Sequence, residues 1–199
     1  MSGEQAPPGG TRLGGDPDRG GAGRLRVADV AVEREERYWY PDDGAIVWVA
    51  GYTPIDPDSG RFLGRDAPQL AARGLIVAGV AGARFHDDVL QSDALAPGTP
   101  LTLRREPGNE HDANAIAVLT AAGAQAGWVP REVAARVAPA LDEGRRWAAV
   151  VLRERRDSPR APRHGLTMLL APAEAIGLRE RTADGGAGAS LTAELPEWR

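Results

Sequence analysis

The stretch from residue 103 to residue 118 reads Leu103-Arg-Arg-Glu-Pro-Gly-Asn-Glu-His-Asp-Ala-Asn-Ala-Ile-Ala-Val118. It links an alternating run of apolar and polar residues at 99–105 to a mostly apolar run at 114–120. Both patterns are typical of short β-strands. Two alanines and a glycine then predict a turn, and residues 124–129 predict a third strand. The middle of the chain is therefore expected to be built from short strands.

Outward from this stretch, three further runs predict strands, at 74–80, 147–153 and 165–170. An arginine-rich loop is expected between the last two, over residues 154–164. Several short strands with one helix indicate a mainly β fold, a small barrel with one or two short helices and flexible termini. Barrels of the oligonucleotide-binding type hold single strands on one sheet face and its loops.

One helix is expected after Pro130, because proline suits the first position of a helix. Val133, Val137 and Leu141 follow at four-residue spacing and would form one apolar face. Gly144 is expected to end the helix. Pro139 lies inside this stretch and is expected to bend or split it.

The N-terminal part of the chain predicts an extension of unknown role over residues 25–72. Residues 25–32 predict a short strand, and the aromatic residues 38–40 and the apolar run 45–50 flank a Pro/Asp/Gly turn, which predicts a hairpin. Residues 33–37 are interpreted as a charged bridge, and 53–64 as turn-rich. The glycine-rich segment 1–24 and most of 172–199 cannot bury enough apolar surface to fold and are predicted to be disordered tails.

Composition excludes several classes of site. The 199-residue chain has no cysteine, so it has neither disulfides nor thiolate metal ligands, and every one of its 24 basic side chains is an arginine. Without lysine there is no nucleotide-binding P-loop. No apolar run is long enough to span a membrane and no signal-peptide core is present, so no membrane partner and a cytoplasmic location are expected.

The net charge of −4 hides a division along the chain. Residues 1–72 carry 8 arginines against 12 acidic residues, whereas residues 73–171 carry 13 against 11, a net charge of +2. Seven of those arginines fall between Arg145 and Arg163, with two acidic residues among them. A local positive patch is enough to attract phosphate.

The stretch 103–118, followed by Ala126-Gly-Trp-Val-Pro130, resembles the HIRAN domain family. Gly79-Val-Ala-Gly-Ala-Arg-Phe85 is similar to that family's opening strand and aromatic turn, and residues 167–170 to its closing strand. The resemblance covers about half of the chain and implies a HIRAN-like, modified oligonucleotide-binding barrel over 73–171. HIRAN domains occur in fork-remodelling helicases of the Swi/Snf type and as stand-alone bacterial proteins.

In the family, the domain captures the 3′ end of single-stranded DNA. The resemblance implies six nucleic-acid-binding residues, namely Arg84, Phe85, His111, Asp112, Trp128 and Arg131. Arginines of the expected loop are further candidates for phosphate contacts, namely Arg155, Arg156 and Arg163. A role in DNA repair or stalled-fork processing follows from the family.

These roles are chemically reasonable. Aromatic rings stack on bases without choosing a sequence, and arginines attract phosphate in a salt-dependent way. The Asp112 carboxylate only accepts hydrogen bonds, so it would bind a free 3′-hydroxyl and repel a terminal phosphate.

Some of these residues could instead have structural roles. Asp112 and Asn114 also fit a turn whose side chains bind local backbone, and Phe85 and Trp128 also fit the core.

A catalytic role is not expected. His86, His111 and His164 have no metal-ligand spacing, and no serine lies in a nucleophile motif, so neither a metal nor another cofactor is predicted. His111 and Asp112 were expected on opposite faces of a strand. The alternative function is a protein-interaction module, which would dock a separately encoded helicase or nuclease through the acidic, aromatic extension 25–72.

Overall fold

The computed structural model describes residues 24–27, 31–39, 46–56 and 59–179. The strands are β1 (Arg24–Val27), β2 (Ala31–Trp39), β3 (Val47–Ile55), β4 (Ile76–Gly79), β5 (Pro100–Arg105), β6 (Ile116–Thr120), β7 (Gln125–Trp128), β8 (Trp147–Arg156), β9 (Arg163–Pro172) and β10 (Ile176–Arg179). The helices are α1 (Pro68–Ala71), α2 (Asp87–Leu90) and α3 (Arg131–Asp142), with 3-10 turns η1 (Ala83–Phe85), η2 (Asp93–Leu95) and η3 (Ala173–Ala175). The fold is thus mainly β, as the sequence predicted.

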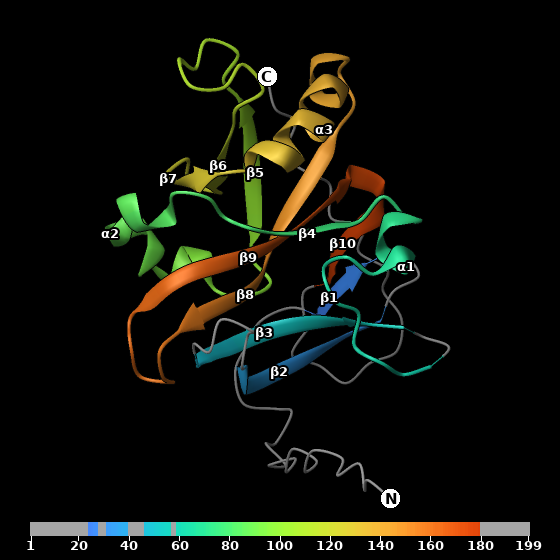
Figure 1. The fold of residues 1–199 in the computed structure, drawn as a ribbon, viewed down its shortest axis with the longest axis vertical. Helices are drawn as coiled ribbons and strands as arrows, with labels where there is room; N and C mark the ends of the chain where they lie inside the picture. The colour runs from blue at the N-terminus through green and yellow to red at the C-terminus, as the bar shows by residue number, and fades with distance from the viewer. Residues whose placement is uncertain (1–23, 28–30, 40–45, 57–58, 180–199) are drawn as a thin grey trace, which may run out of the picture.

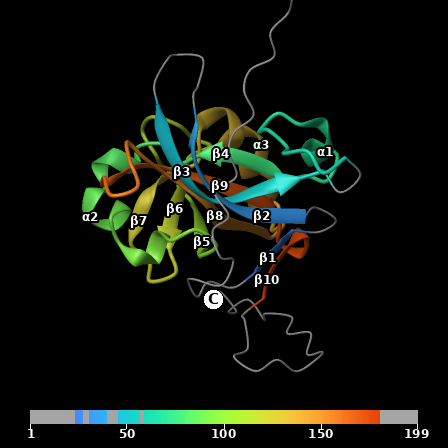
Figure 2. The ribbon, with the colours of Figure 1, turned by 90° about the horizontal axis from the view of Figure 1, so that it is seen from below.

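Eight strands form one antiparallel sheet, in which β2, β3, β8, β5, β6 and β7 follow one another. Strand β9 pairs with the other edge of β8, and β4 pairs with β9. The long strands β8 and β9 cross the middle of the molecule, with the β2–β3 hairpin at one end and α3 at the other (Figure 1). Viewed from the hairpin end, α1 and α2 lie on opposite sides (Figure 2). Strands β1 and β10 form a separate pair.

The sheet curls until β7 meets the segment that follows β4. Ala81 and Trp128 exchange two backbone hydrogen bonds there, at 2.8 and 2.9 Å. Gly127 permits this approach, because a Cβ at that position would lie 2.3 Å from the carbonyl oxygen of Ala81. Its φ of +143° is also a conformation that side chains disfavour. The glycine of the Gly127-Trp128 pair is therefore required for the two segments to meet.

Two apolar clusters stabilise this arrangement. The larger includes Ile116, Val118 and Met168 from the sheet, all fully buried, together with Val133 and Val137 of α3. The apolar face predicted for the helix is therefore the one that packs on the sheet. The smaller cluster includes Tyr52 of β3, Leu70 of α1 and Leu152 of β8. It ties the N-terminal hairpin to the same sheet.

Helix α3 runs unbroken from Arg131 to Asp142, with Pro139 inside it. The helix is therefore not split at Pro139. Pro139 and Ala135, whose carbonyl loses its usual backbone donor, are both exposed, so water can satisfy that carbonyl. Pro130 immediately precedes the helix and does not form its first turn.

The strands extend further than their apolar runs. Residues 33–37, interpreted as a charged bridge, lie inside β2, whose outer edge pairs with no other strand of the described residues. Charged residues are common on such edges because they discourage further pairing. Residues 53–55, expected in a turn, belong to β3. The predicted hairpin turn at 41–44 and the tails at 1–23 and 180–199 lie outside the described residues.

Three boundaries near the predicted site also differ from expectation. Strand β6 begins at Ile116, so His111, Asp112 and Asn114 lie in the preceding loop, and the strand argument about His111 and Asp112 is wrong. Strands β8 and β9 extend to Arg156 and back to Arg163, which leaves only 157–162 as a loop. Ordered structure also continues past the expected domain end at residue 171, into η3 and β10.

Candidate nucleic-acid interface

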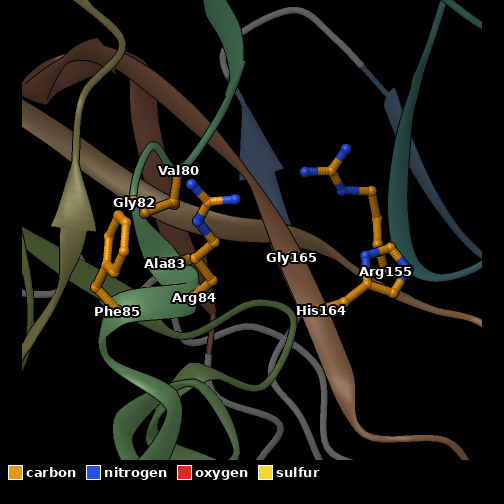
Figure 3. A pocket seen from close by; sticks show the side chains of 8 residues that line it. All are labelled: Val80, Gly82, Ala83, Arg84, Phe85, Arg155, His164 and Gly165. Atoms are coloured by element: carbon orange, nitrogen blue, oxygen red, sulfur yellow. The ribbon is translucent and has the colours of Figure 1, made fainter.

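An open cavity of about 300 Å³ lies between η1 and the start of β9. Its lining comprises Val80, Gly82, Ala83, Arg84, Phe85, Arg155, His164 and Gly165. The guanidinium groups of Arg84 and Arg155 lie on the same side of this space, and the ring of Phe85 stands next to Gly82 (Figure 3). Segments distant in sequence thus bring two arginines and an aromatic ring to one place.

Arg84 and Phe85 are presented by a sharp turn. Gly82 adopts a left-handed conformation (φ +69°) and starts η1. Phe85 is 71% exposed, so its ring contributes little to the core. The Arg84 guanidinium carbon lies 4.9 Å from the centre of that ring, within cation–π range. Within the described residues, Arg84 has no acidic partner. An exposed ring next to an unpaired cation is suited to a nucleotide.

Arg155 approaches the cavity from β8. Its position pairs with Gly165 of β9, and its guanidinium lies over that glycine, since a Cβ at 165 would be 2.7 Å from one terminal nitrogen. The Nε atom of Arg155 is buried and has no hydrogen-bond partner. Burial, and secondarily the charge of Arg65, lower the pKa of Arg155. This half-buried cation thus has no counter-charge among the residues that the structure describes.

Trp128 ends β7 and is half-buried. Gly82 lies against its ring, because a Cβ at that position would be 3.1 Å from the indole. The ring of His86 lies 5.3 Å away, centre to centre. The indole Nε1–H donates a hydrogen bond to Glu106 at 3.0 Å. Trp128 therefore supports the turn that carries Arg84 and Phe85.

The loop between β5 and β6 is fixed by its own polar side chains. Asn109 Oδ1 accepts hydrogen bonds from the backbone N–H groups of His111 and Asp112, at 3.0 and 3.3 Å. Asp112 Oδ1 accepts one from the backbone N–H of Asn114 at 2.9 Å. Asx turns of this kind hold a loop in one conformation. The turn interpretation of Asp112 is therefore present in the structure.

Asp112 keeps binding capacity beyond the turn. Its second oxygen, Oδ2, lies 3.5 Å from Nε of Arg131, and a carboxylate has about four acceptor positions. Arg131 also donates to the carbonyl oxygen of His111 at 2.7 Å, and its side chain is 73% exposed. The three residues His111, Asp112 and Arg131 thus lie together and reach the surface.

Glu106 connects the two groups of predicted residues. It accepts hydrogen bonds from Trp128, below the Arg84–Phe85 turn, and from Asn109, which holds His111 and Asp112. The hydrogen bond from Trp128, followed by that from Arg104, lowers the pKa of Glu106. One ionised carboxylate therefore links Trp128 to the loop that carries His111 and Asp112.

Arg163 and Arg156 are engaged elsewhere. Arg163 is buried and donates to Glu154 and to the carbonyl oxygens of Leu90 and Ser92. Arg156 donates hydrogen bonds from two nitrogens to the same Glu154. It donates another to the carbonyl oxygen of Ala161. Burial alone would raise the pKa of Glu154, but hydrogen bonds from Arg156 and Arg163 outweigh it and lower that pKa. These contacts favour structural roles over the suggested phosphate contacts.

Four residues next to the site carry no role in the sequence interpretation: Glu106, Asn109, His164 and Gly165. Strand alternation could have separated Arg155 from Arg156, because neighbouring residues of a strand face opposite sides and Arg155 must therefore face away from Glu154 and Arg156. Recognising it would have required β8 to be extended through its charged end.

Two features are absent from the described part of the chain. No group of three or more histidine, aspartate or glutamate side chains is placed to hold a metal ion. None of the helices there is long and apolar enough to cross a membrane.

The fold and site thus define a small antiparallel β domain with an aromatic and arginine-lined surface. Residues 73–164 match the family model of the HIRAN domain, and this chain contains a HIRAN domain. The resemblance drawn from its central stretch is therefore confirmed.

Known proteins share this part of the chain. The mouse helicase-like transcription factor is 37% identical over 89 residues, which are 44% of this chain and 8% of the mouse protein. The crystal structure of the HIRAN domain of human HLTF is 25% identical, with a TM-score of 0.38, over 51% of this chain and 79% of that one. A Lactobacillus plantarum protein is 26% identical, with a TM-score of 0.35, over 49% and 99%. This chain therefore spans only a small part of the length of its mouse relative.

Proposed function

We propose that this chain is a non-catalytic module that binds single-stranded DNA at a free 3′ end. The observation that carries the proposal is the exposed ring of Phe85 next to Arg84, which has no acidic partner within the described residues. The HIRAN match over residues 73–164 supports it. A place in DNA repair or replication-fork processing belongs to the same proposal.

Affinity would come from stacking and from phosphate contacts. Phe85 offers a ring that any base can stack on, worth roughly 1–3 kcal/mol. Arg84 and Arg131, both exposed, would bind phosphates and release counterions, so affinity falls as salt rises. Neither contribution depends on the base, and the module would therefore bind single strands with little sequence preference.

Recognition of the end would come from Asp112. Its Oδ1 is occupied by the Asn114 backbone, but Oδ2 has acceptor capacity left, and the side chain is 19% exposed. A 3′-hydroxyl can donate a hydrogen bond to it, whereas a 3′-phosphate is repelled by the negative charge. Arg131, which holds Oδ2 from one side, would orient it.

Fluorescence anisotropy with a short 5′-labelled strand tests the proposal. The strand carries either a 3′-hydroxyl or a 3′-phosphate and is titrated at low and at high salt. The wild type is expected to prefer the hydroxyl and to bind more weakly at high salt. Asp112→Asn keeps an acceptor for the Asn114 N–H but removes the charge, so the loop should survive while the preference falls.

The outcomes separate the parts of the proposal. Absence of binding to either strand at low salt would overturn DNA binding altogether. Equal affinity for both ends would overturn end recognition and leave general single-strand binding. An Asp112→Asn variant that discriminates as well as the wild type would show that another group recognises the hydroxyl.

A protein-docking role for the N-terminal hairpin is the second candidate. Three apolar side chains of its described part are exposed, namely Tyr38, Trp39 and Ile46. An apolar contact with a helicase or nuclease would persist at high salt, unlike DNA binding. A partner captured through this surface should be lost on Trp39→Ala while DNA affinity is unchanged.

A further inference from the structure

Strand β8 carries three arginines near its end, and only one lacks an acidic partner within the described residues. Arg153 lies 3.6 Å from Glu35, and Arg156 lies 3.0 Å from Glu154. Arg155, between them, faces the cavity and has no ion pair there. Burying a cation without a counter-charge is costly, so the position calls for an explanation.

The floor below Arg155 is made of glycine. A Cβ at Gly165 would lie 2.7 Å from Nη2 and 2.9 Å from Nε of Arg155, and one at Gly79 would lie 3.8 Å from the same Nη2. The flat guanidinium therefore rests on bare backbone, with its Nε buried and unbonded. A side chain at residue 165 would displace it from this place.

The charged residues around the cavity favour a ligand of one charge. Arg84 lines the same cavity, and the charge of Arg65 acts on Arg155. His164 is at the mouth, where its Nε2 lies 3.6 Å from Asp157. Among the described residues no carboxylate lines the cavity, so the missing partner of Arg155 would be an anion with oxygen acceptors.

We propose that Arg155, which rests on Gly165 and lines the same cavity as Arg84, is a phosphate subsite that holds one backbone phosphate of the strand stacked on Phe85. The planar guanidinium offers several N–H donors in one plane, which suits two phosphate oxygens. This inference rests on the proposed DNA binding for the identity of the phosphate, but the anion site itself does not.

The anion site is tested by thermal unfolding in phosphate and in chloride at equal ionic strength. Wild-type Tm should rise more in phosphate than that of Arg155→Gln, because only the wild type has the site. In chloride, Arg155→Gln should be at least as stable as the wild type, since it removes an unpaired buried charge. Arg160→Gln, which removes an exposed arginine from the neighbouring loop, should respond as the wild type does.

Gly165→Ala gives an independent variant that keeps the charge but moves the guanidinium. Its Tm response to phosphate should fall toward that of Arg155→Gln. If the Tm of the wild type and that of Arg155→Gln respond equally to phosphate, the subsite is overturned, whatever the result of the DNA-binding measurements. If Arg155→Gln is instead clearly less stable in chloride, Arg155 is a structural residue and the subsite is overturned as well.

Single strands with one neutral methylphosphonate linkage then locate the phosphate. Arg155→Gln should weaken binding of the unmodified strand roughly 10- to 100-fold. At one linkage, the neutral substitution should weaken binding of the strand by the wild type but not by Arg155→Gln. An additive loss at every linkage overturns the contact with DNA. A phosphate response that depends on Arg155, without any DNA binding, would support the anion site and overturn the proposed function.

Discussion

Trp128 and Glu106 are joined by a hydrogen bond of 3.0 Å from the indole Nε1–H to Oε2, across 22 positions of the chain. The bond links the end of β7 to the loop that follows β5. Glu106 also accepts hydrogen bonds from Arg104 and Asn109, at 2.9 and 3.3 Å. One carboxylate thereby holds the end of β7 against the loop between β5 and β6.

Trp128→Phe should destabilise the protein most at neutral pH. The hydrogen bond from Trp128 lowers the folded-state pKa of Glu106, so its stabilisation is present above the ordinary glutamate pKa and disappears as pH falls through the lowered value. The expected loss at neutral pH is about 1–2 kcal/mol, and it should shrink in acid. Urea unfolding at neutral and acidic pH measures it. A deficit of equal size at both pH values would contradict the role assigned to this bond.

The sequence predicted most of the fold because its strands carry apolar runs and α3 carries a four-residue apolar repeat. Val133 and Val137 were placed on the buried face for this reason, and they are buried. The charged parts of strands were missed. Residues 33–37 and the end of β8 contain mainly charged side chains, and the ion pair between Arg153 and Glu35 forms only once β2, β3 and β8 are assembled.

The residues of the candidate site could be predicted only from the family resemblance. It supplied Phe85 and Asp112, but composition could not show that Phe85 would be exposed or that Asn109 would hold Asp112 in a turn. Arg155 and Arg163 look alike in sequence. One is left without a partner in the described structure and the other is enclosed by three acceptors, and that difference depends on the packing of β9 against α2.

Phe85→Ala should weaken single-strand binding without destabilising the fold. The ring is 71% exposed, so little core packing is lost, whereas a stacked base contributes roughly 1–3 kcal/mol. The matched control is Phe62→Ala, because Phe62 is 55% exposed and also has an arginine, Arg37, 5.8 Å from its ring centre. Anisotropy and thermal unfolding of both variants give the answer. Equal losses of affinity would place the strand elsewhere.

Arg163→Met should cost stability, not DNA affinity. Removing the guanidinium leaves Glu154 with Arg156 alone, removes the donor to the Leu90 carbonyl oxygen and leaves that of Ser92 with the Leu95 N–H only, which should cost about 2–4 kcal/mol. Arg160→Met, at an exposed position of the loop that precedes β9, should change stability by less than about 0.5 kcal/mol. Urea unfolding compares them. A stable Arg163→Met variant that binds DNA poorly would instead restore the phosphate contact first suggested for Arg163.

Gly127→Ala should be strongly destabilising. Its φ is +143°, and the added Cβ would lie 2.3 Å from the Ala81 carbonyl oxygen and 2.7 Å from the Val80 side chain, so β7 must move away from the segment after β4. Strain and overpacking together should cost about 3 kcal/mol or more.

Gly123→Ala separates the two causes, because Gly123 also has a positive φ (+85°) but has no atom within 4 Å of the added Cβ. It should lose only the strain, about 1 kcal/mol. If urea unfolding gives both variants the same stability, the approach of Ala81 to Trp128 does not depend on the bare backbone of Gly127. A Gly127→Ala variant that still folds should also bind single strands less well, because the turn with Arg84 and Phe85 would shift with β7.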